Sequence, residues 1–330
     1  MKSVINHRIL SSAALFLFAA GSMVSAQVTK SYEQVKAEHP GFIQIPGKLI
    51  RQDCVHEVPS GALIDIGSDG NPTGDVKMNG KLIAHYDSCP EQSIDTRHFG
   101  SQGGQSPNPS GYGDGWVEAS QWELSLGASD NIDELYGFWH VPQPPADAGA
   151  LVFWFNGIEP SGENWIMQPV LQWGDNGSFG GNYYTFASWL VGPEGTGLAW
   201  YSSPNNVNPG DYLFGAQAQN GVSGNTLSYF VNSDDTTTNQ NSILNFTSTG
   251  IHWVWAFAGV LEAYNVTSCS QYPPNDVSHF YQTTIAHGYP AYDFYKTQKF
   301  YGAEYDYFGS GGPQCNFSVS ISGTTSTLNY

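Results

Sequence analysis

From residue 116 onward the sequence is a series of short runs of aromatic and β-branched residues, each followed by turn residues such as Gly, Pro, Asn or Asp. The runs lack the 3.6-residue period of an amphipathic helix, and their regular spacing is typical of strands joined by tight turns. We therefore predict an all-β chain that forms an antiparallel two-sheet β-sandwich. The expected strands are 134–141, 150–157, 164–174, 183–191, 197–201, 211–219, 226–231, 242–246, 252–266, 277–284 and 315–322.

The amino-acid composition excludes several other classes of protein. Charged residues make up 12% of the 330 residues, which is about half of their usual share in soluble domains. This share is too low for a coiled coil or a helical bundle, and the 14% of aromatic residues argues against disorder. The formal net charge of −18 leaves no cluster of cations for a phosphate backbone, so we expect no nucleic-acid partner.

The charges are distributed unevenly along the chain. Residues 116–330 contain 18 acidic residues and two basic ones, Lys296 and Lys299, whereas residues 27–115 contain 11 acidic and seven basic residues. At about pH 3–4 the acidic part would lose most of its charge and gain little positive charge. The pattern indicates either adaptation to acid or simply the solubility of an exported protein.

The first 26 residues have the three parts of a secretory signal peptide. Lys2 and Arg8 form the charged start, residues 10–20 are apolar, and residues 24–26 (Val-Ser-Ala) are typical of a cleavage site. After residue 26 the sequence contains no run of about 18 apolar residues, which is the length that a membrane-spanning helix needs. We therefore expect a secreted, extracellular protein with no membrane partner, and we expect a monomer because nothing in the sequence requires an oligomer.

The rest of the chain divides near residue 115. Residues 100–115 are dominated by Gly, Ser, Pro and Gln, which is the composition of a linker. Before them, the mixed region contains two strand-like runs, 61–66 and 81–86. We expect an N-terminal extension at 27–115 and a β-sandwich domain at 116–330.

Four cysteines, Cys54, Cys89, Cys269 and Cys315, allow two disulfide bonds in three pairings. We predict Cys54–Cys89 and Cys269–Cys315, because each bond then stabilises one region of the chain. The spacings lack the short C-x2-C unit of a metal site, and the nine histidines form no metal-binding motif. We therefore expect neither a metal nor another cofactor.

Three polar side chains stand out in otherwise apolar strands. Gln168 and Gln172 lie in the run 164–174, and Glu262 lies near the end of the long run that begins at His252. A buried polar group without a hydrogen-bond partner costs about 1–3 kcal/mol, so each of the three needs a partner. The partner is either a neighbouring strand or loop, or the rest of a functional site.

The stretches around these residues carry a resemblance to a known family. In order along the chain they are Phe138–Pro142, Trp154–Glu159, Ile166–Gln168 with Val170–Gly174, Ala199–Pro204, Pro209–Asp211 and Leu261–Tyr264. They are similar to the motifs of the glutamic peptidases (eqolisins): a strand ending in Val-Pro, then W-V-G-I-D-G, I-L-Q-T-G, E-W-Y-P, A-G-D and A-E-W. The resemblance covers residues 116–266 and rests on the shared order of the motifs.

The resemblance implies a concanavalin-like jelly-roll sandwich and a secreted, acid-active endopeptidase with a catalytic Glu–Gln pair. Glu262 would activate a water molecule, and the amide of Gln168 or Gln172 would stabilise the oxyanion. The spacing favours Gln168 and the local similarity favours Gln172. The two stand about 13 Å apart in a strand, so at most one can serve. The partners would be protein or peptide substrates. The side chains expected to bind substrate are Trp154, Glu159, Trp173 and Trp200.

The chain departs from the family pattern at three places. One residue is inserted before Gly157, Glu159 stands where the family has Asp, and Ala263 follows Glu262 where the family has Trp. These departures bear on which residues take the catalytic and binding roles.

Alternatives remain open for the extension and for the function, and one of them is a catalytically idle relative that only binds peptides. The extension 27–115 is either a removable propeptide, as the resemblance implies, or an integral layer held by the Cys54–Cys89 bond. The alternative function is a secreted carbohydrate-binding or carbohydrate-active sandwich, because ten Trp and 19 Tyr suit stacking on sugars and the same architecture serves both functions. The carboxylates of Glu159, Glu163 and Glu262 could then form a glycosidase pair.

Overall fold

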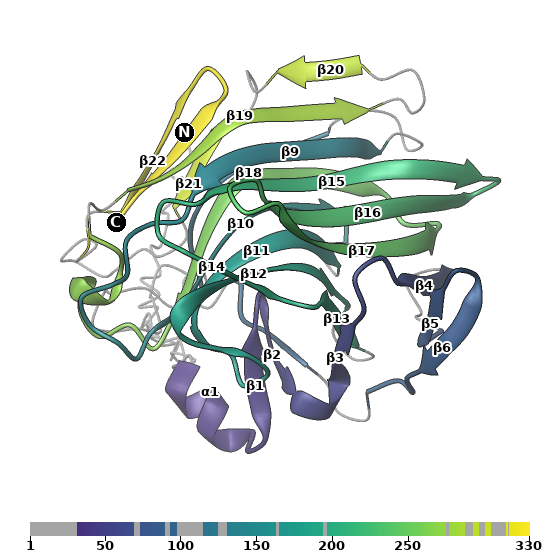
Figure 1. Cartoon of the computed structure of the whole chain (residues 1–330), viewed down its shortest axis with the longest axis horizontal. Helices are drawn as coiled ribbons and strands as arrows, with labels where there is room; N and C mark the ends of the chain where they lie inside the picture. Colours follow the sequence, from purple (N-terminus) through teal and green to yellow (C-terminus); the bar gives the residue numbers. More distant parts are fainter. Residues whose placement is uncertain are drawn as a thin grey trace, which may run out of the picture.

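The structure is a computed structural model of the chain. It describes residues 32–68, 73–89, 93–97, 115–124, 131–162, 165–193, 197–274, 277–287, 293–296, 301–304, 315 and 317–330. The expected signal peptide (1–26) and most of the expected linker (100–115) lie outside these ranges. The described chain is almost entirely β-strand, with a single α-helix, α1 (Tyr32–Glu38), so the predicted all-β fold is confirmed (Figure 1).

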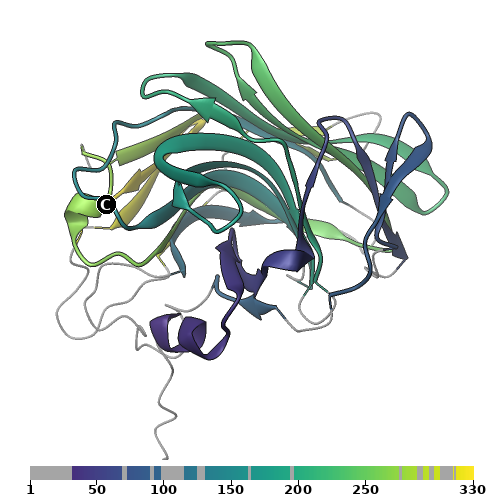
Figure 2. The same ribbon diagram turned by 60° about the horizontal axis from the view of Figure 1, so that its bottom comes forward.

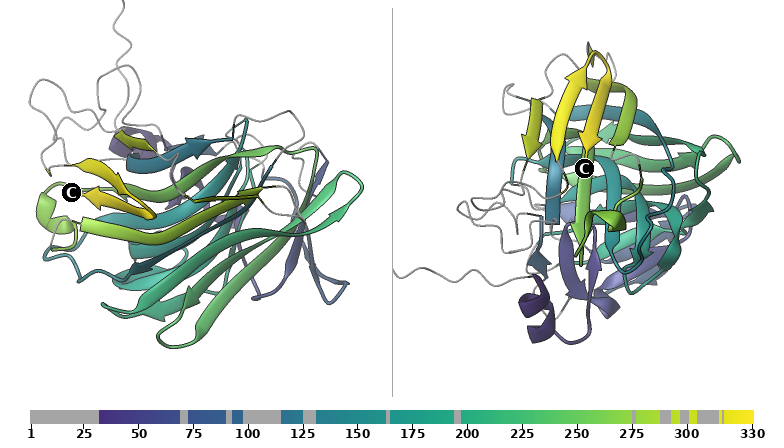
Figure 3. Two further views of the ribbon diagram at one scale, coloured as in Figure 1. Left: turned by 90° about the horizontal axis from the view of Figure 1, so that it is seen from above. Right: turned by 90° about the vertical axis from the view of Figure 1, so that its left-hand side faces the viewer.

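Two large sheets form the layers of the sandwich, as the views in Figure 3 show. The first has nine strands in the order β21-β8-β18-β10-β11-β12-β13-β3, with β14 paired to β12. Its strands are β21 (Tyr301–Glu304), β8 (Gly115–Glu123), β18 (Trp253–Tyr264), β10 (Leu151–Pro160), β11 (Ile166–Asp175), β12 (Gly180–Val191), β13 (Ala199–Ser202), β14 (Asn205–Val207) and β3 (Val55–Val58).

The second sheet has eleven strands in the order β22-β23-β19-β9-β15-β16-β17-β4-β5-β6, with β20 paired to β19. Burial alternates along its central strands, because one side faces the first sheet and the other faces outward. The strands are β22 (Ser318–Ser322), β23 (Thr325–Asn329), β19 (Val277–His287), β20 (Asp293–Lys296), β9 (Ile132–His140), β15 (Tyr212–Ser223), β16 (Thr226–Asp235), β17 (Gln240–Thr249), β4 (Leu63–Ser68), β5 (Asp75–Met78) and β6 (Lys81–His85).

The N-terminal region contributes to three places in the fold. Strands β1 (Phe42–Ile45) and β2 (Lys48–Arg51) form a hairpin, and β7 (Ile94–Asp95) pairs with β2 to complete a small three-stranded sheet. A 3-10 helix, η1 (Gln52–Cys54), then leads into β3. Strand β3 pairs with β13 and β4 pairs with β17, and both pairings are parallel, unlike the antiparallel pairing predicted throughout. The extension therefore supplies edge strands to both large sheets.

Both predicted disulfide bonds are present. Cys54 is bonded to Cys89 within the N-terminal region, and Cys269, which begins the 3-10 helix η2 (Cys269–Gln271), is bonded to Cys315. Each bond thus joins residues of one region, as predicted. No helix in the described part of the chain is long and apolar enough to cross a membrane.

Each predicted strand corresponds to an observed one, with ends that differ by several residues. The runs at 61–66 and 81–86 form β4 and β6. Strands β8 and β23 were not expected, because β8 begins at the end of the linker-like stretch and β23 is rich in Ser and Thr. The short strands of the N-terminal hairpin carry too few residues to show a period in the sequence.

Candidate functional site

Glu262 lies on the side of the nine-stranded sheet that faces away from the eleven-stranded sheet. On β18 it pairs with Phe153 of β10, and Phe153 pairs in turn with Gln172 of β11. Paired residues share a face, so these three side chains form one row across three strands. Gln168 lies on the same face of β11 as Gln172, four residues away, and pairs with Trp189.

The carboxylate of Glu262 is fully buried and accepts three hydrogen bonds. The main-chain N–H of Gly47 donates to Oε1 (2.7 Å), the hydroxyl of Tyr264 also donates to Oε1 (2.5 Å), and the indole N–H of Trp116 donates to Oε2 (3.1 Å). The Tyr264 oxygen lies 2.6 Å from Oγ1 of Thr96, which accepts a hydrogen bond from the amide of Gln44 (2.9 Å). A continuous chain of polar groups therefore runs from Gln44 to the carboxylate.

Burial strongly affects the ionisation of Glu262. Removal from water raises the pKa of its carboxyl group from 4.5 to about 7, although the donors Tyr264, Gly47 and Trp116 each favour the ionised form. The group therefore titrates near neutral pH while the site is covered. A carboxyl group in this range can either accept or donate a proton, which suits it to acid–base chemistry.

The hydrogen-bond donor that reaches Glu262 from outside the sheet belongs to the turn of the β1–β2 hairpin. Pro46 and Gly47 occupy this turn, and Gly47 has a φ of 78°, as expected at the third position of a type II turn. The N–H of Gly47 binds Glu262, and its carbonyl accepts a hydrogen bond from the N–H of Thr96 (3.0 Å). Both main-chain groups of Gly47 are thus satisfied at the centre of the site.

The hairpin is part of a larger N-terminal cover, which we define as residues 34–54, 89 and 93–97. Figure 2 shows these elements, in purple and blue, lying against the nine-stranded sheet. Apolar side chains of the cover pack on aromatic residues of the sheet, including Phe153, Phe155 and Trp189. The cover residues in this cluster are Val35, Phe42, Ile45, Leu49, Ile50, Cys54 and Cys89. The face that carries Glu262 is therefore closed by a hydrophobic contact.

Two buried cations of the cover reach polar groups of the sheet. Arg97 forms ion pairs with Asp95 of the cover and with Glu159 of β10. Burial opposes ionisation of Asp95, but the charge of Arg97 and the hydrogen bonds that Arg97 donates together outweigh it and lower the pKa of this carboxyl group. The ammonium group of Lys48 donates to the carbonyl of Gly192. Glu159, one of the expected substrate-binding residues, is thus on the same face as Glu262 and is paired with the cover.

The two candidate glutamines have different surroundings. The Gln172 amide donates to the carbonyls of Gly174 (2.8 Å) and Phe179 (3.1 Å), and its oxygen accepts from Asn176 (2.9 Å), so the side chain holds the turn between β11 and β12. Both polar atoms of Gln168 are buried and have no hydrogen-bond partner among the described residues. Gln168 is therefore the side chain that an added ligand would satisfy.

Neither glutamine is hydrogen-bonded to Glu262. From the strand spacing and rise, the Cα atoms of Gln172 and Glu262 are about 10 Å apart, with Phe153 between them, and those of Gln168 and Glu262 are about 16 Å apart. The expected Glu–Gln contact is thus not made in this covered arrangement. The catalytic role of either glutamine stays a prediction.

The three expected substrate-binding tryptophans lie on the opposite side of the sheet. Trp154 and Trp173 pack in one cluster between the two sheets, and Trp200 packs in another. They alternate in the strands with residues of the covered face, such as Phe153, so they point away from Glu262. Their role in substrate binding stays a prediction, and the three side chains lie across the sheet from Glu262.

The sequence did not identify Tyr264, Trp116 and Gly47 as hydrogen-bond donors to Glu262, or Thr96 as the partner of Tyr264. A signal existed for Tyr264, because residues that are two positions apart in a strand point to the same face of the sheet. The other three come from segments 146 or more residues away in the chain, and only the tertiary fold brings them together.

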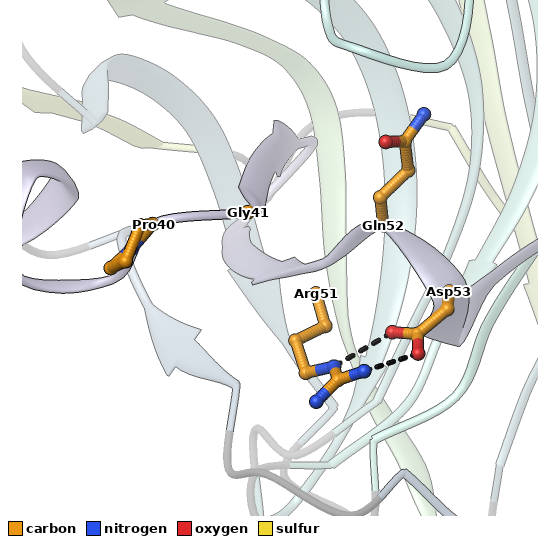
Figure 4. Close-up of a pocket in the computed structure, with 5 residues that line it drawn as sticks. All are labelled: Pro40, Gly41, Arg51, Gln52 and Asp53. Atoms are coloured by element: carbon orange, nitrogen blue, oxygen red, sulfur yellow. Dashed lines mark hydrogen bonds and ion pairs between the residues drawn. The ribbon is translucent and has the colours of Figure 1, made fainter.

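A cavity of about 490 Å³ lies at the open end of the hairpin, away from its turn. Figure 4 shows its lining, which includes the exposed ion pair of Arg51 and Asp53. Because the turn with Gly47 is at the other end of the hairpin, this cavity does not reach Glu262.

No family model and no curated protein matches the chain, but solved structures do. A crystal structure of scytalido-glutamic peptidase with a transition-state analogue inhibitor matches with a TM-score of 0.44 and 14% identity, covering 65% of this chain and 97% of that one. SCP-B, a member of the eqolisin family of peptidases in complex with the tripeptide Ala-Ile-His, matches with a TM-score of 0.44 and 15% identity, over 65% and 98% of the two chains. Two of the similar structures are glutamic peptidases.

A third structure has a different description. The enzymatically active domain of tailspike protein 2 from bacteriophage CBA120 matches with a TM-score of 0.27 and 12% identity, over 58% of this chain and 30% of that one.

Proposed function

We propose that this protein is a secreted, acid-active endopeptidase of the glutamic type whose general base is Glu262. One observation carries the proposal: the main-chain N–H of a peptide segment, at Gly47, already donates to the Glu262 carboxylate. The face around Glu262 therefore accommodates a peptide backbone. The order of the motifs in residues 116–266, which resembles that of the glutamic peptidases, supports the same activity.

In this proposal the covered arrangement is a latent form. The segment 27–115 is a propeptide, and its removal uncovers Glu262. The position of the segment supports this role, because its strands form the small sheet of the cover or lie at the edges of the two large sheets. Among the strand pairings of described residues 32–97 with the rest of the sandwich, removal breaks β3–β13 and β4–β17, and it also breaks the contacts of the cover with the nine-stranded sheet.

Once the cover is gone, a peptide substrate and a water molecule take the place of the hairpin turn. Glu262 accepts a proton from the water, and the water oxygen bonds to the carbonyl carbon of the scissile peptide. The Tyr264 hydroxyl and the Trp116 indole N–H, both already beside the carboxylate, are the nearest donors for the developing oxyanion. The tetrahedral intermediate collapses, the C–N bond breaks, and Glu262 gives its proton to the departing amine.

Gln168 would bind the substrate at a distance from the scissile bond. Its buried amide has no partner among the described residues, and it lies on the same face as Glu262. An extended peptide that crosses the strands could hydrogen-bond to it a few residues from Glu262. Gln168 is therefore the substrate-binding amide of this proposal, and Gln172 supports the β11–β12 turn.

Exposure of the site also accounts for activity in acid. Burial is the largest cause of the raised pKa of Glu262, so removing the cover returns this pKa toward its ordinary value of 4.5. The base is then ionised from about pH 4–5 upward. The covered form, with its pKa of about 7, would have a protonated glutamate at the same pH.

The proposal is tested by incubating the secreted protein with casein at about pH 3.5–4.5. Pepstatin is added because it inhibits pepsin-like contaminants. N-terminal sequencing of the active species should give a start between 100 and 118, and a start at Gln27 in an active species would contradict removal. We expect Glu262→Gln to lose about 10²–10⁴-fold in kcat, whereas Glu123→Gln, at an exposed glutamate at the end of β8, should not change it.

Two further variants separate the roles of the other side chains. Tyr264→Phe should lower kcat, whereas Gln168→Met should mainly raise KM. A Glu262→Gln protein that keeps full peptidase activity would refute the proposal, and an equal loss of kcat in Gln168→Met would assign the glutamine to the reaction itself.

A further inference from the structure

The outward face of the eleven-stranded sheet carries a group of aromatic rings far from Glu262. Alternate residues of β9 and β15 point outward and are partly exposed, whereas their neighbours in the strands are buried. We call these residues, together with Tyr281 of β19, the aromatic face: Tyr136, Phe138, His140, Tyr212, Phe214 and Tyr281. Strands β19, β9 and β15 lie side by side in Figure 1.

The rings are held in a fixed arrangement by the strand register. His140 pairs with Tyr212 and Phe138 pairs with Phe214, so rings on neighbouring strands meet. The centroids of Phe138 and Tyr212 are 5.3 Å apart in a stacked geometry, and those of His140 and Tyr212 are 4.7 Å apart. Aromatic side chains on paired strands lose little further freedom when they bind, which favours a platform for a flat ligand.

A cavity of about 340 Å³ opens at one end of the aromatic face. Its lining combines rings with neutral hydrogen-bonding groups: His140, Tyr212, Tyr281, Gln282, Thr324 and Thr325. Gln282 has a φ of 51° and lies within the irregularity that interrupts the β19–β9 register between Tyr281 and Thr284. Such irregularities often redirect a side chain next to a functional site. The volume lies in the range of small-ligand sites, about 300–1,000 Å³.

The charges around the aromatic face limit the class of ligand. Glu134 on β9 and Asp234 on β16 point outward beside the rings, and no Lys or Arg is among the described side chains of this face. An anionic polymer would be repelled by these carboxylates and by the net charge of −18. A purely apolar ligand would leave the amide and hydroxyl groups of the cavity without partners.

We propose that the aromatic face and its cavity bind a neutral polysaccharide. A pyranose ring offers an apolar face that stacks on an aromatic ring, and hydroxyl groups that hydrogen-bond to Gln282, Thr324 and Thr325. The Glu134 and Asp234 carboxylates can accept hydrogen bonds from further hydroxyl groups. This site lies on the other sheet from Glu262 and is independent of the proposed peptidase activity. The protein would thus attach to a polysaccharide matrix through one sheet while the other carries Glu262.

Binding is measured by sedimentation with insoluble chitin and cellulose, and by affinity electrophoresis in gels that contain xylan or a neutral β-glucan. Polygalacturonate serves as the anionic comparison. We expect retention by at least one neutral polymer that does not weaken at high salt. Tyr212→Ala should reduce this binding about tenfold or more, and Tyr212→Phe, which keeps the ring, should retain most of it. Tyr183→Ala, at an exposed tyrosine on β12, should leave it unchanged.

The same assays also separate this proposal from the peptidase proposal. Glu262→Gln should bind the polysaccharide as well as the unmodified protein does. The proposal is overturned if no neutral polymer retains the protein, if polygalacturonate or immobilised casein alone does so, or if Tyr212→Ala, with its melting temperature unchanged, binds as before.

Discussion

The main-chain N–H of Gly47 donates to Oε1 of Glu262 at 2.7 Å, although the two residues are 215 positions apart in the chain. This hydrogen bond joins the tip of the N-terminal hairpin to the centre of the nine-stranded sheet. It means that the ionisation of Glu262 and the docking of the cover affect each other, because the pKa of a buried carboxyl group depends on what excludes water from it.

The first prediction concerns stability and pH. The pKa of Glu262 in the folded protein, about 7, is higher than its ordinary value of 4.5. The protonated Glu262 side chain therefore contributes fully to the free energy of unfolding below about pH 4.5, and this contribution is lost as the pH rises through 7. The loss amounts to at most about 3 kcal/mol, or roughly 5 °C in melting temperature. Melting curves of the unmodified protein and Glu262→Gln between pH 5 and 8 measure it.

The difference between the two curves isolates Glu262 from other groups. Burial lowers the pKa of His56 to about 4, so neutral His56 stabilises the fold as the pH rises, but it does so equally in both proteins. We expect Glu262→Gln to gain stability relative to the unmodified protein as the pH increases. Parallel curves across this range would show that Glu262 is not buried in the manner described.

The second prediction concerns the hairpin turn. Gly47→Ala places a Cβ at a φ of 78° and 3.3 Å from Cγ of Arg97, so we expect the cover to lose about 1–2 kcal/mol of docking free energy. Trypsin should then cut at Lys48 or Arg51 about tenfold faster, as followed by mass spectrometry. Gly224→Ala, with a φ of 62° in an open turn, has a similar backbone cost and should not expose these sites. Equal cutting of both variants would contradict a local effect.

The third prediction compares the two disulfide bonds. The loops that they close, with separations of 35 and 46 residues, are similar, and the chain-entropy model gives about 4 kcal/mol for each. Replacing Cys54 and Cys89 by Ser should loosen the cover and speed tryptic cutting of the hairpin. Replacing Cys269 and Cys315 by Ser should lower the melting temperature and leave the hairpin protected. The prediction fails if the second variant exposes the hairpin as much as the first.

The fourth prediction separates the two glutamines by stability. Gln168→Met removes a buried amide that has no partner among the described residues, so the free energy of unfolding should stay the same or rise by about 1 kcal/mol. Gln172→Met removes three hydrogen bonds and should lower it by about 1–3 kcal/mol. Urea unfolding of both variants checks this. A marked destabilisation by Gln168→Met would mean that Gln168 has a structural role.

Several parts of the fold and the site could be predicted from the sequence. Runs of alternating or apolar residues predict strands, because a half-buried sheet needs such side chains. The two disulfide pairings were predicted by assigning one bond to each region of the chain. Gln168, Gln172 and Glu262 were recognisable as polar groups in apolar strands, and all three are buried on one face. The distance of Glu262 from the two glutamines was not predictable, because it depends on the register between strands that are far apart in the sequence.

The sequence by itself determined that this chain forms β-sheets and that it holds a few polar groups at apolar positions, since both properties follow from the local pattern of side chains. Only the tertiary structure decided that the N-terminal residues close the face with Glu262, that Gly47 and Trp116 donate to the carboxylate, and that three expected tryptophans face the other way. The physical reason is that strand register and sheet order are fixed by contacts between distant segments. The local sequence of one segment does not show which distant segment will bury it.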